Sequence, residues 1–203
     1  EKDKRNTDIW TWDLTRHTLT RLTFDAGVDR GYAEQILDTL ADYGVRASFG
    51  MTGQWADENP DLVKRMVVDG HMLFNHTYDH RSLTGSSTAD RDEGVTTREE
   101  RQQELTDTEA IVRDLTDYEV APYFRPPYGD LDDSVLADIA DAGYWITVMW
   151  TCDSLGWNGA SVEQIVERCG DNASPGDIIL IQRILNIFQM RRFYATGKFG
   201  LRI

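Results

Sequence analysis

Two of the chain's four histidines lie four positions apart in the polar stretch NHTYDH, as His76 and His80. Both rings can face one point if the segment makes a helical turn, and imidazole nitrogen is a common ligand of Zn²⁺. A polar loop with two solvated rings fits the same residues, so the pair alone does not establish a metal site. Carboxylates that could complete such a site occur in TFDAGVD, which provides Asp25 and Asp29.

Two further polar stretches carry side chains that could take part in catalysis or binding. In FRPPYGD, two prolines follow Arg125 and stiffen the backbone, so the guanidinium could pair with a carboxylate and fix its ionisation. A stiff turn with a surface arginine is the alternative. In WTCDSLGWNG, Asp153 follows an apolar run, and Trp157 could stack on a sugar ring or belong to the core.

The rest of the chain alternates between strand-like and helix-like patterns. Strands are expected at 18–24, 45–51, 71–75, 122–125, 144–150 and 176–181, and helices at 29–44, 59–70, 96–116, 131–143 and 161–170. This order predicts parallel strands joined by helical crossovers, in either an open doubly wound sheet or a barrel.

Candidate residues follow several of these strands directly. In parallel α/β folds, chemistry gathers at the carboxyl ends of the strands. Asp25 follows the first expected strand, and His76 and His80 follow the third. Arg125 ends the fourth expected strand, and Asp153 follows the fifth. We therefore predict that these residues, although distant in sequence, meet on one rim of the sheet.

Composition and charge limit the possible classes of protein. The 203 residues suit one domain, and 40% hydrophobic residues with six Trp indicate a folded globule. The net charge of −14 disfavours nucleic acid and anionic membranes as partners, and no apolar run is long enough for a membrane span. The two cysteines, Cys152 and Cys169, are expected to be buried free thiols, with one disulfide as the alternative.

The charge changes sign near the end of the chain. All 35 acidic residues precede residue 182, so residues 1–181 carry 16 − 35 = −19 and residues 182–203 carry +5. We accordingly expect a main domain at 1–181 and a divergent basic tail at 182–203.

Five motifs, LTFDAG, NHTYDH, FRPPYG, DSLGW and GDIILI, occur in this order between residues 18 and 181. Together they resemble the polysaccharide deacetylases, the NodB-homology family of carbohydrate esterases. The resemblance implies an α/β fold, a distorted and incomplete (β/α) barrel, whose C-terminal closure the divergent tail leaves open. It also implies a divalent metal, usually zinc with cobalt as an alternative, and removal of acetyl groups from an acetylated polysaccharide or oligosaccharide.

The resemblance assigns catalytic and metal-binding roles to five residues. Asp25 resembles the general base that takes a proton from the attacking water, and His76 and His80 resemble the metal ligands. Arg125 resembles the residue that orients Asp25, and Asp153 a partner of Arg125. General base catalysis combined with a metal is chemically suited to hydrolysis of an acetyl group.

The resemblance also assigns three substrate contacts. The backbone N–H of Tyr128 would bind the oxyanion, Trp157 would form part of the groove wall, and Leu180 would line the pocket for the acetyl methyl group.

Two positions depart from the family pattern. Where the family commonly has a second Asp as a metal ligand, this chain has Ala26, and Asp29 or water would have to substitute. Where the last motif normally ends in a general-acid His, this chain has Gln182, which can donate a hydrogen bond but cannot deliver a proton at neutral pH.

The resulting prediction is a metal-dependent hydrolase that deacetylates N-acetylglucosamine polymers such as peptidoglycan or chitin-like oligomers. Such substrates imply an extracellular or cell-envelope location. The alternatives are a catalytically impaired carbohydrate-binding member of the family, favoured by Ala26 and Gln182, and a hydrolase of small-molecule non-peptide C–N bonds on the same scaffold.

Overall fold

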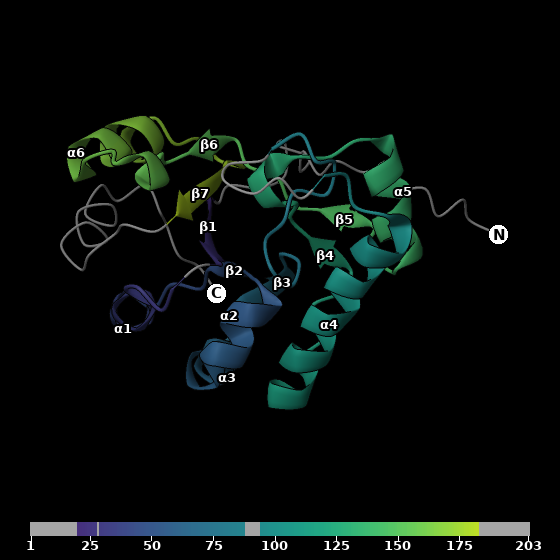
Figure 1. The fold of residues 1–203 in the computed structure, drawn as a ribbon. Helices are drawn as coiled ribbons and strands as arrows, with labels where there is room; N and C mark the ends of the chain where they lie inside the picture. The colour runs from purple at the N-terminus through teal and green to yellow at the C-terminus, as the bar shows by residue number, and fades with distance from the viewer. Residues whose placement is uncertain (1–19, 28, 88–93, 183–203) are drawn as a thin grey trace.

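The computed structural model describes residues 20–27, 29–87 and 94–182 (Figure 1). In these residues, seven parallel strands form one curled sheet in the order β5-β4-β3-β2-β1-β7-β6. The strands are β1 (Arg21–Ala26), β2 (Ser48–Met51), β3 (Met72–Asn75), β4 (Tyr123–Phe124), β5 (Ile146–Thr147), β6 (Cys152–Asp153) and β7 (Ile178–Gln182). The sheet curls into half a barrel, which confirms the predicted distorted, incomplete (β/α) barrel.

Helices cover the outside of this curled sheet. They are α1 (Ala33–Asp42), α2 (Gly53–Glu58), α3 (Pro60–Val68), α4 (Arg98–Thr116), α5 (Asp133–Asp141) and α6 (Val162–Ile165), with the short helices η1 (Pro127–Gly129), η2 (Gly156–Asn158) and η3 (Val166–Asp171). Helices α1 to α4 lie along one side of the sheet, and α6 lies beside the end formed by β6 and β7 (Figure 1).

Local sequence signals explain several helix ends. The Thr-x-x-Glu pattern forms a complete capping box at the start of α4, with Thr97 and Glu100 satisfying each other's backbone N–H groups. Pro60 is the first residue of α3, and Asn59 occupies the cap position. The side chain of Asn59 makes no cap hydrogen bond; its Nδ2 donates to the Trp55 carbonyl at 2.9 Å, and its Oδ1 accepts from Arg30 Nη1 at 3.3 Å.

Four elements differ between the prediction and the structure. Helix α2 and strand β6 were not expected, because six and two residues are too short to show a periodic pattern. The expected strand at 144–150 shortens to Ile146–Thr147. The expected helix at 161–170 starts as α6 and continues as the π-helical turn η3.

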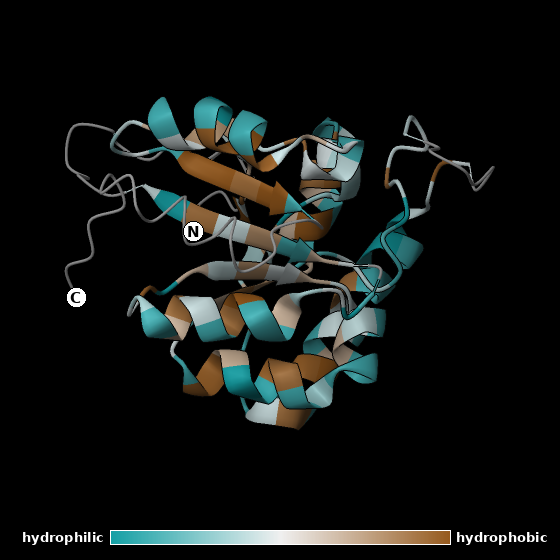
Figure 2. Cartoon of the chain, turned by 90° about the vertical axis from the view of Figure 1, so that its left-hand side faces the viewer, coloured by the Kyte–Doolittle hydropathy of each residue, from teal (hydrophilic) through white to brown (hydrophobic). Residues whose placement is uncertain are grey.

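The core lies between the sheet and the helices. Phe24 of β1 and Phe49 of β2 stack with their ring centres 5.1 Å apart. Leu37 and Leu40 of α1 and Met66 of α3 are among the helix residues that are completely buried. Figure 2 shows apolar residues gathered on the strands and hydrophilic residues on much of the outer helix surface. This packing holds the central strands rigidly and therefore fixes the direction of side chains at their ends.

Cys152 and Cys169 form a disulfide, so the expectation of two free thiols was wrong. Strand β6 lies beside η3, and this brings the two Cα atoms to 5.8 Å, a usual separation for a disulfide. The bond ties the two-residue edge strand to the segment that follows it.

The predicted basic tail begins at Gln182, the last described residue, and the rest of it lies outside the described residues. Among the described residues, none of the helices combines the length and the hydrophobicity of a membrane-spanning segment.

Candidate active site

Asp25 lies near the end of the central strand β1, with Gly50 of β2 and Gln182 of β7 as its neighbours in register. Gly50 makes room for the carboxylate. A Cβ atom at Gly50 would come within 2.9 Å of the Asp25 Oδ1 atom and 2.3 Å of the Phe74 ring. The absent side chain therefore allows a buried acid to lie between two strands.

Arg125 follows β4 and is completely buried. Its Nη1 donates to Asp25 Oδ1 at 2.7 Å, its Nη2 to Thr23 Oγ1 at 2.9 Å, and its Nε to the Val148 carbonyl at 2.8 Å. The rings of Phe74 and Trp150 lie 4.8 and 5.5 Å from the guanidinium carbon. The guanidinium is thus fixed on all sides and pairs with Asp25.

His76 follows β3 and is almost completely buried. Its Nδ1 lies 2.8 Å from the Arg125 carbonyl oxygen. Because a carbonyl only accepts, Nδ1 carries the proton and Nε2 presents a lone pair. This Nε2 has no hydrogen-bond partner among the described residues and lies 3.6 Å from Asp25 Oδ2.

His80 completes the group. Its ring centre lies 4.8 Å from that of His76 on one side and 4.8 Å from that of Tyr128 on the other, both in edge-to-face geometry. The structure thus brings Asp25, Arg125, His76, His80 and Tyr128 together at one rim of the sheet.

The charges of the group favour an ionised acid and a neutral ring. Burial tends to raise the pKa of Asp25, but the charge and the hydrogen bond of the Arg125 guanidinium outweigh it and hold that pKa below its usual value. Burial lowers the pKa of His76, against the opposing effect of Asp25. Two acceptors, a carboxylate oxygen and an imidazole lone pair, therefore face each other, which suits a cation or a water molecule between them.

The residues present could provide two protein ligands to a metal ion. The orphaned, buried Nε2 of His76 has the chemistry of a metal ligand, and His80 lies beside it. The side chain of Ala26 has no atom that could bind a metal, and Asp29 is exposed. In the described ranges, no group of three His, Cys, Asp or Glu side chains could hold a metal ion, so Asp29 is not brought into a three-ligand site.

Asp153 does not pair with Arg125, contrary to the expectation. The three guanidinium nitrogens of Arg125 bond Asp25, Thr23 and Val148. Asp153 instead accepts from the Leu155 N–H at 2.8 Å and from Trp157 Nε1 at 3.2 Å. Its observed role is to hold the turn that carries Trp157.

The remaining predicted residues occupy different environments. Trp157 in η2 is 55% exposed and Tyr128 in η1 is 45% exposed, so both can meet a ligand from solution. Leu180 in β7 is completely buried, with Thr23 and Asp153 as its neighbours in register. Gln182 lies in register with Asp25, so the chain has an amide beside its buried acid.

Two positioning residues were not predicted from the sequence. Thr23 accepts from Arg125, and Asn75 joins three segments by donating to the Leu105 carbonyl and Tyr144 hydroxyl and accepting from the Thr77 N–H. The sequence could have identified Asn75 as a positioning residue, since it is a polar residue at the end of an apolar strand and directly precedes the candidate ligand His76. Thr23 had none, because a threonine within a strand is ordinary.

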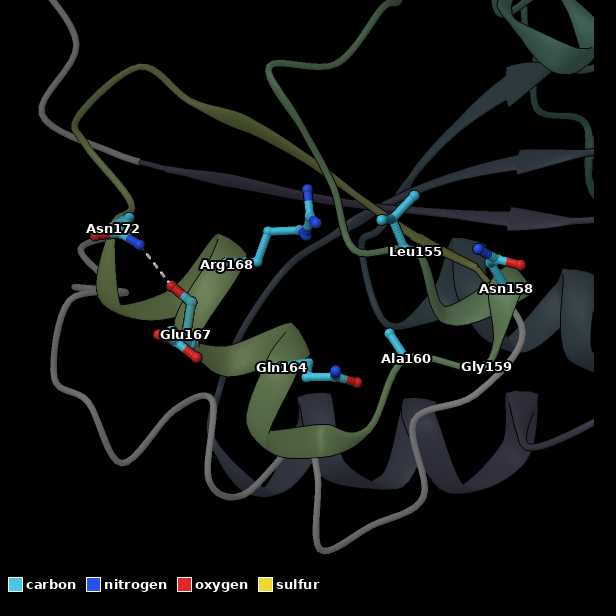
Figure 3. A pocket seen from close by; sticks show the side chains of 8 residues that line it. All are labelled: Leu155, Asn158, Gly159, Ala160, Gln164, Glu167, Arg168 and Asn172. Atoms are coloured by element: carbon cyan, nitrogen blue, oxygen red, sulfur yellow. Dashed lines mark hydrogen bonds between the residues drawn. The ribbon is translucent and has the colours of Figure 1, made fainter.

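A hollow of about 670 Å³ lies elsewhere on the surface (Figure 3). Its lining residues come from the segment around η2, α6 and η3, namely Leu155, Asn158, Gly159, Ala160, Gln164, Glu167, Arg168 and Asn172. None of the rim residues belongs to this lining, so the hollow does not mark the candidate active site.

The curled parallel sheet and its polar rim define a NodB-type (β/α) barrel. The family of polysaccharide deacetylases matches residues 15–146, and the chain belongs to that family. It is similar to two peptidoglycan-N-acetylglucosamine deacetylases of Bacillus cereus: 34% identical to one, covering 78% of this chain and 54% of that protein, and 33% identical to the other, covering 89% and 80%. A chitooligosaccharide deacetylase of Sinorhizobium fredii is 34% identical over 79% of this chain and 69% of that protein. The chain thus spans about half the length of one relative and more than two thirds of the other two.

Solved structures share the fold. The Bc1960 peptidoglycan N-acetylglucosamine deacetylase is 28% identical with a TM-score of 0.76, covering 90% of this chain and 83% of that one. A family 4 carbohydrate esterase from Streptomyces lividans, in complex with acetate, is 27% identical with a TM-score of 0.74, covering 89% and 90%. A family 4 pseudoenzyme from Bacillus anthracis, 24% identical, has a TM-score of 0.73 and covers 90% of this chain and 62% of that one. The fold by itself therefore does not establish activity.

Proposed function

We propose that the chain removes acetyl groups from N-acetylglucosamine-containing polysaccharide, such as peptidoglycan or chitin-like oligomers. The observation that carries the proposal is the buried pair of acceptors, in which Asp25 faces the orphaned Nε2 of His76 at 3.6 Å and is held by Arg125 at 2.7 Å. The named activities of the relatives support this substrate class. Substrates of this kind place the protein in the cell envelope or outside the cell.

Asp25 is the general base of the proposed reaction. It accepts the proton of the attacking water, and the donors of Arg125 keep the carboxylate ionised and aimed. The Arg125 carbonyl holds the His76 ring in the tautomer that leaves Nε2 available. The backbone N–H of Tyr128 then stabilises the charge that develops on the acetyl oxygen.

His76 and His80 would hold a divalent metal, with Zn²⁺ as the expected ion and Co²⁺ as a substitute. When bound, such an ion would polarise the acetyl carbonyl and acidify the attacking water. The two histidines are the protein ligands of this proposed site, and water or substrate would complete the coordination.

The leaving amine also needs a proton, and Gln182 beside Asp25 cannot supply one. The proton must therefore come from solvent or from Asp25 after it has accepted one from water. An ester leaving group needs less protonation than an amine, so ester substrates should suffer less from the missing acid.

The experiment that tests this proposal measures acetate release from chitooligosaccharides and from p-nitrophenyl acetate, with added Zn²⁺ or Co²⁺ and with EDTA. His76→Ala would be compared with the control Arg168→Ala, which changes an exposed residue of the separate hollow. We expect metal-dependent release in wild type and the control and its loss in His76→Ala. Release that survives both EDTA and His76→Ala would refute the proposal.

A catalytically impaired carbohydrate-binding protein is the second candidate. It is favoured by Ala26, by Gln182 beside Asp25, and by the lack of a three-ligand group in the described residues. The exposed Trp157 would then provide a stacking surface for sugar rings. Binding of chitooligosaccharides that Trp157→Ala abolishes, without acetate release from folded, zinc-loaded protein, would favour this candidate.

A further inference from the structure

The histidine loop, residues 76–80, has an unfavourable backbone. Thr77 and His80 have φ angles of 67° and 64°, in the left-handed region that residues with a side chain seldom adopt. Such conformations persist where surrounding contacts determine them. The contacts that hold this loop therefore also determine where its two imidazoles lie.

Helix α2 holds the carbonyl groups of the loop. At the start of the helix, the Gly53 N–H donates to the Thr77 carbonyl at 3.0 Å and the Gln54 N–H donates to the Tyr78 carbonyl at 3.0 Å. The Tyr78 ring packs against Gly53 so closely that a Cβ atom there would come within 2.4 Å of it. One side of the loop is thus fixed to α2.

Helix α4 holds the amide groups of the loop through one side chain. Glu104 Oε2 accepts from the Tyr78 N–H at 2.8 Å and from the Asp79 N–H at 3.1 Å. The Glu104 side chain is only 10% exposed, and Arg81 Nε lies 3.5 Å from its other oxygen. Hydrogen bonds to a carboxylate are stronger than those between neutral groups.

The bonded amides lie between the two histidines in sequence, so the carboxylate acts on the segment that sets their separation. Helices α2 and α4 pack against each other. The histidine loop is therefore hydrogen-bonded on both sides to one packed pair of helices. Tyr78 and Asp79 can move only if one of these two sets of hydrogen bonds breaks.

We propose that Glu104 is a positioning residue, whose carboxylate holds the histidine loop so that His76 and His80 face the same point beside Asp25. The inference rests on the proposed function for its catalytic consequence but not for its structural one. Glu104 acts through the backbone of Tyr78 and Asp79, and no contact with substrate is required.

The test compares Glu104→Leu and Glu104→Gln with wild type. The control is Gln103→Ala, which removes an exposed side chain of the same helix whose Nε2 donates to Asp107. Amide hydrogen exchange at single residues is measured by NMR, and acetate release from chitooligosaccharides is measured in parallel. Exchange does not depend on activity, so wild type without acetate release would count against the proposed function and leave the test of Glu104 intact.

In Glu104→Leu we expect exchange at Tyr78 and Asp79 to be at least about tenfold faster than in wild type, with strands β1 and β2 unchanged. We expect kcat to fall about 10- to 100-fold, with KM within about twofold. Glu104→Gln keeps one acceptor oxygen, so its exchange rates and its kcat should lie between those of Glu104→Leu and wild type. Gln103→Ala should match wild type in both.

Unchanged exchange at Tyr78 and Asp79 in Glu104→Leu would overturn the inference, and so would equal acceleration in β1 and β2, because Glu104 would then serve stability alone. If Glu104→Leu does not fold, Glu104→Gln decides. Faster exchange confined to the histidine loop supports the inference, and wild-type exchange there overturns it.

Discussion

Arg125 provides the sharpest prediction for stability. Arg125→Met replaces the guanidinium, which lies near the rings of Phe74 and Trp150, by a shorter apolar chain. The substitution leaves Asp25, whose side chain is only 6% exposed, without its 2.7 Å ion-pair partner. Removing one member of a buried pair costs about 3–5 kcal/mol, because the other charge stays buried and uncompensated. For a chain of 203 residues this corresponds to a fall in Tm of about 6–20 °C.

The assay is urea unfolding of wild type, Arg125→Met, Asp25→Asn and the double variant. If the cost of Arg125→Met arises from the stranded carboxylate, Asp25→Asn should restore about half of it or more in the double variant. A cost below about 1 kcal/mol for Arg125→Met, or strictly additive effects of the two substitutions, would refute the reasoning.

Three further predictions address pH, metal and proton supply. His71 accepts the Ala47 N–H on Nδ1 at 3.1 Å, and burial lowers the pKa of this ring, so the unfolded state binds the proton more tightly. The free energy of unfolding should therefore fall as the pH drops below about 6.5, with a shallower fall in His71→Asn, as measured by urea unfolding across this range. Asp29→Ala should change zinc affinity in isothermal titration by less than about twofold, and His76→Ala should lower it more than about tenfold; a large loss in Asp29→Ala would show that this exposed acid is a ligand. Gln182→His should raise acetate release from chitooligosaccharides by about 10²-fold or more, and release from p-nitrophenyl acetate by less; equal gains would show that no general acid is missing.

That the candidate residues meet at one rim of the sheet could be predicted, because it follows from the topology. Once strands and helices alternate, parallel strands place Asp25, His76 and Arg125 at the same edge, whatever their separation in sequence. The pairing of Arg125 with Asp25 was implied by the resemblance to the deacetylase family, and the 2.7 Å contact between the two side chains confirms it.

Choices among similar partners could not be predicted. Asp153 was expected to meet Arg125, but the three guanidinium nitrogens bond Asp25, Thr23 and Val148, a result that depends on side-chain packing. The Cys152–Cys169 disulfide depends on β6 lying beside η3, and two residues give no pattern for a strand. Glu104 is one of many acids on a polar helix, and its two backbone contacts arise only when the histidine loop folds onto α4.

The step most specific to the proposed function is transfer of a proton to Asp25 from a water molecule next to His76. Its most direct test is acetate release from chitooligosaccharides by zinc-supplemented wild type and by Asp25→Asn, with the folding of both verified by circular dichroism. We expect release by wild type and a loss of about 10²-fold or more in Asp25→Asn. Wild-type rates in a folded Asp25→Asn variant would contradict it.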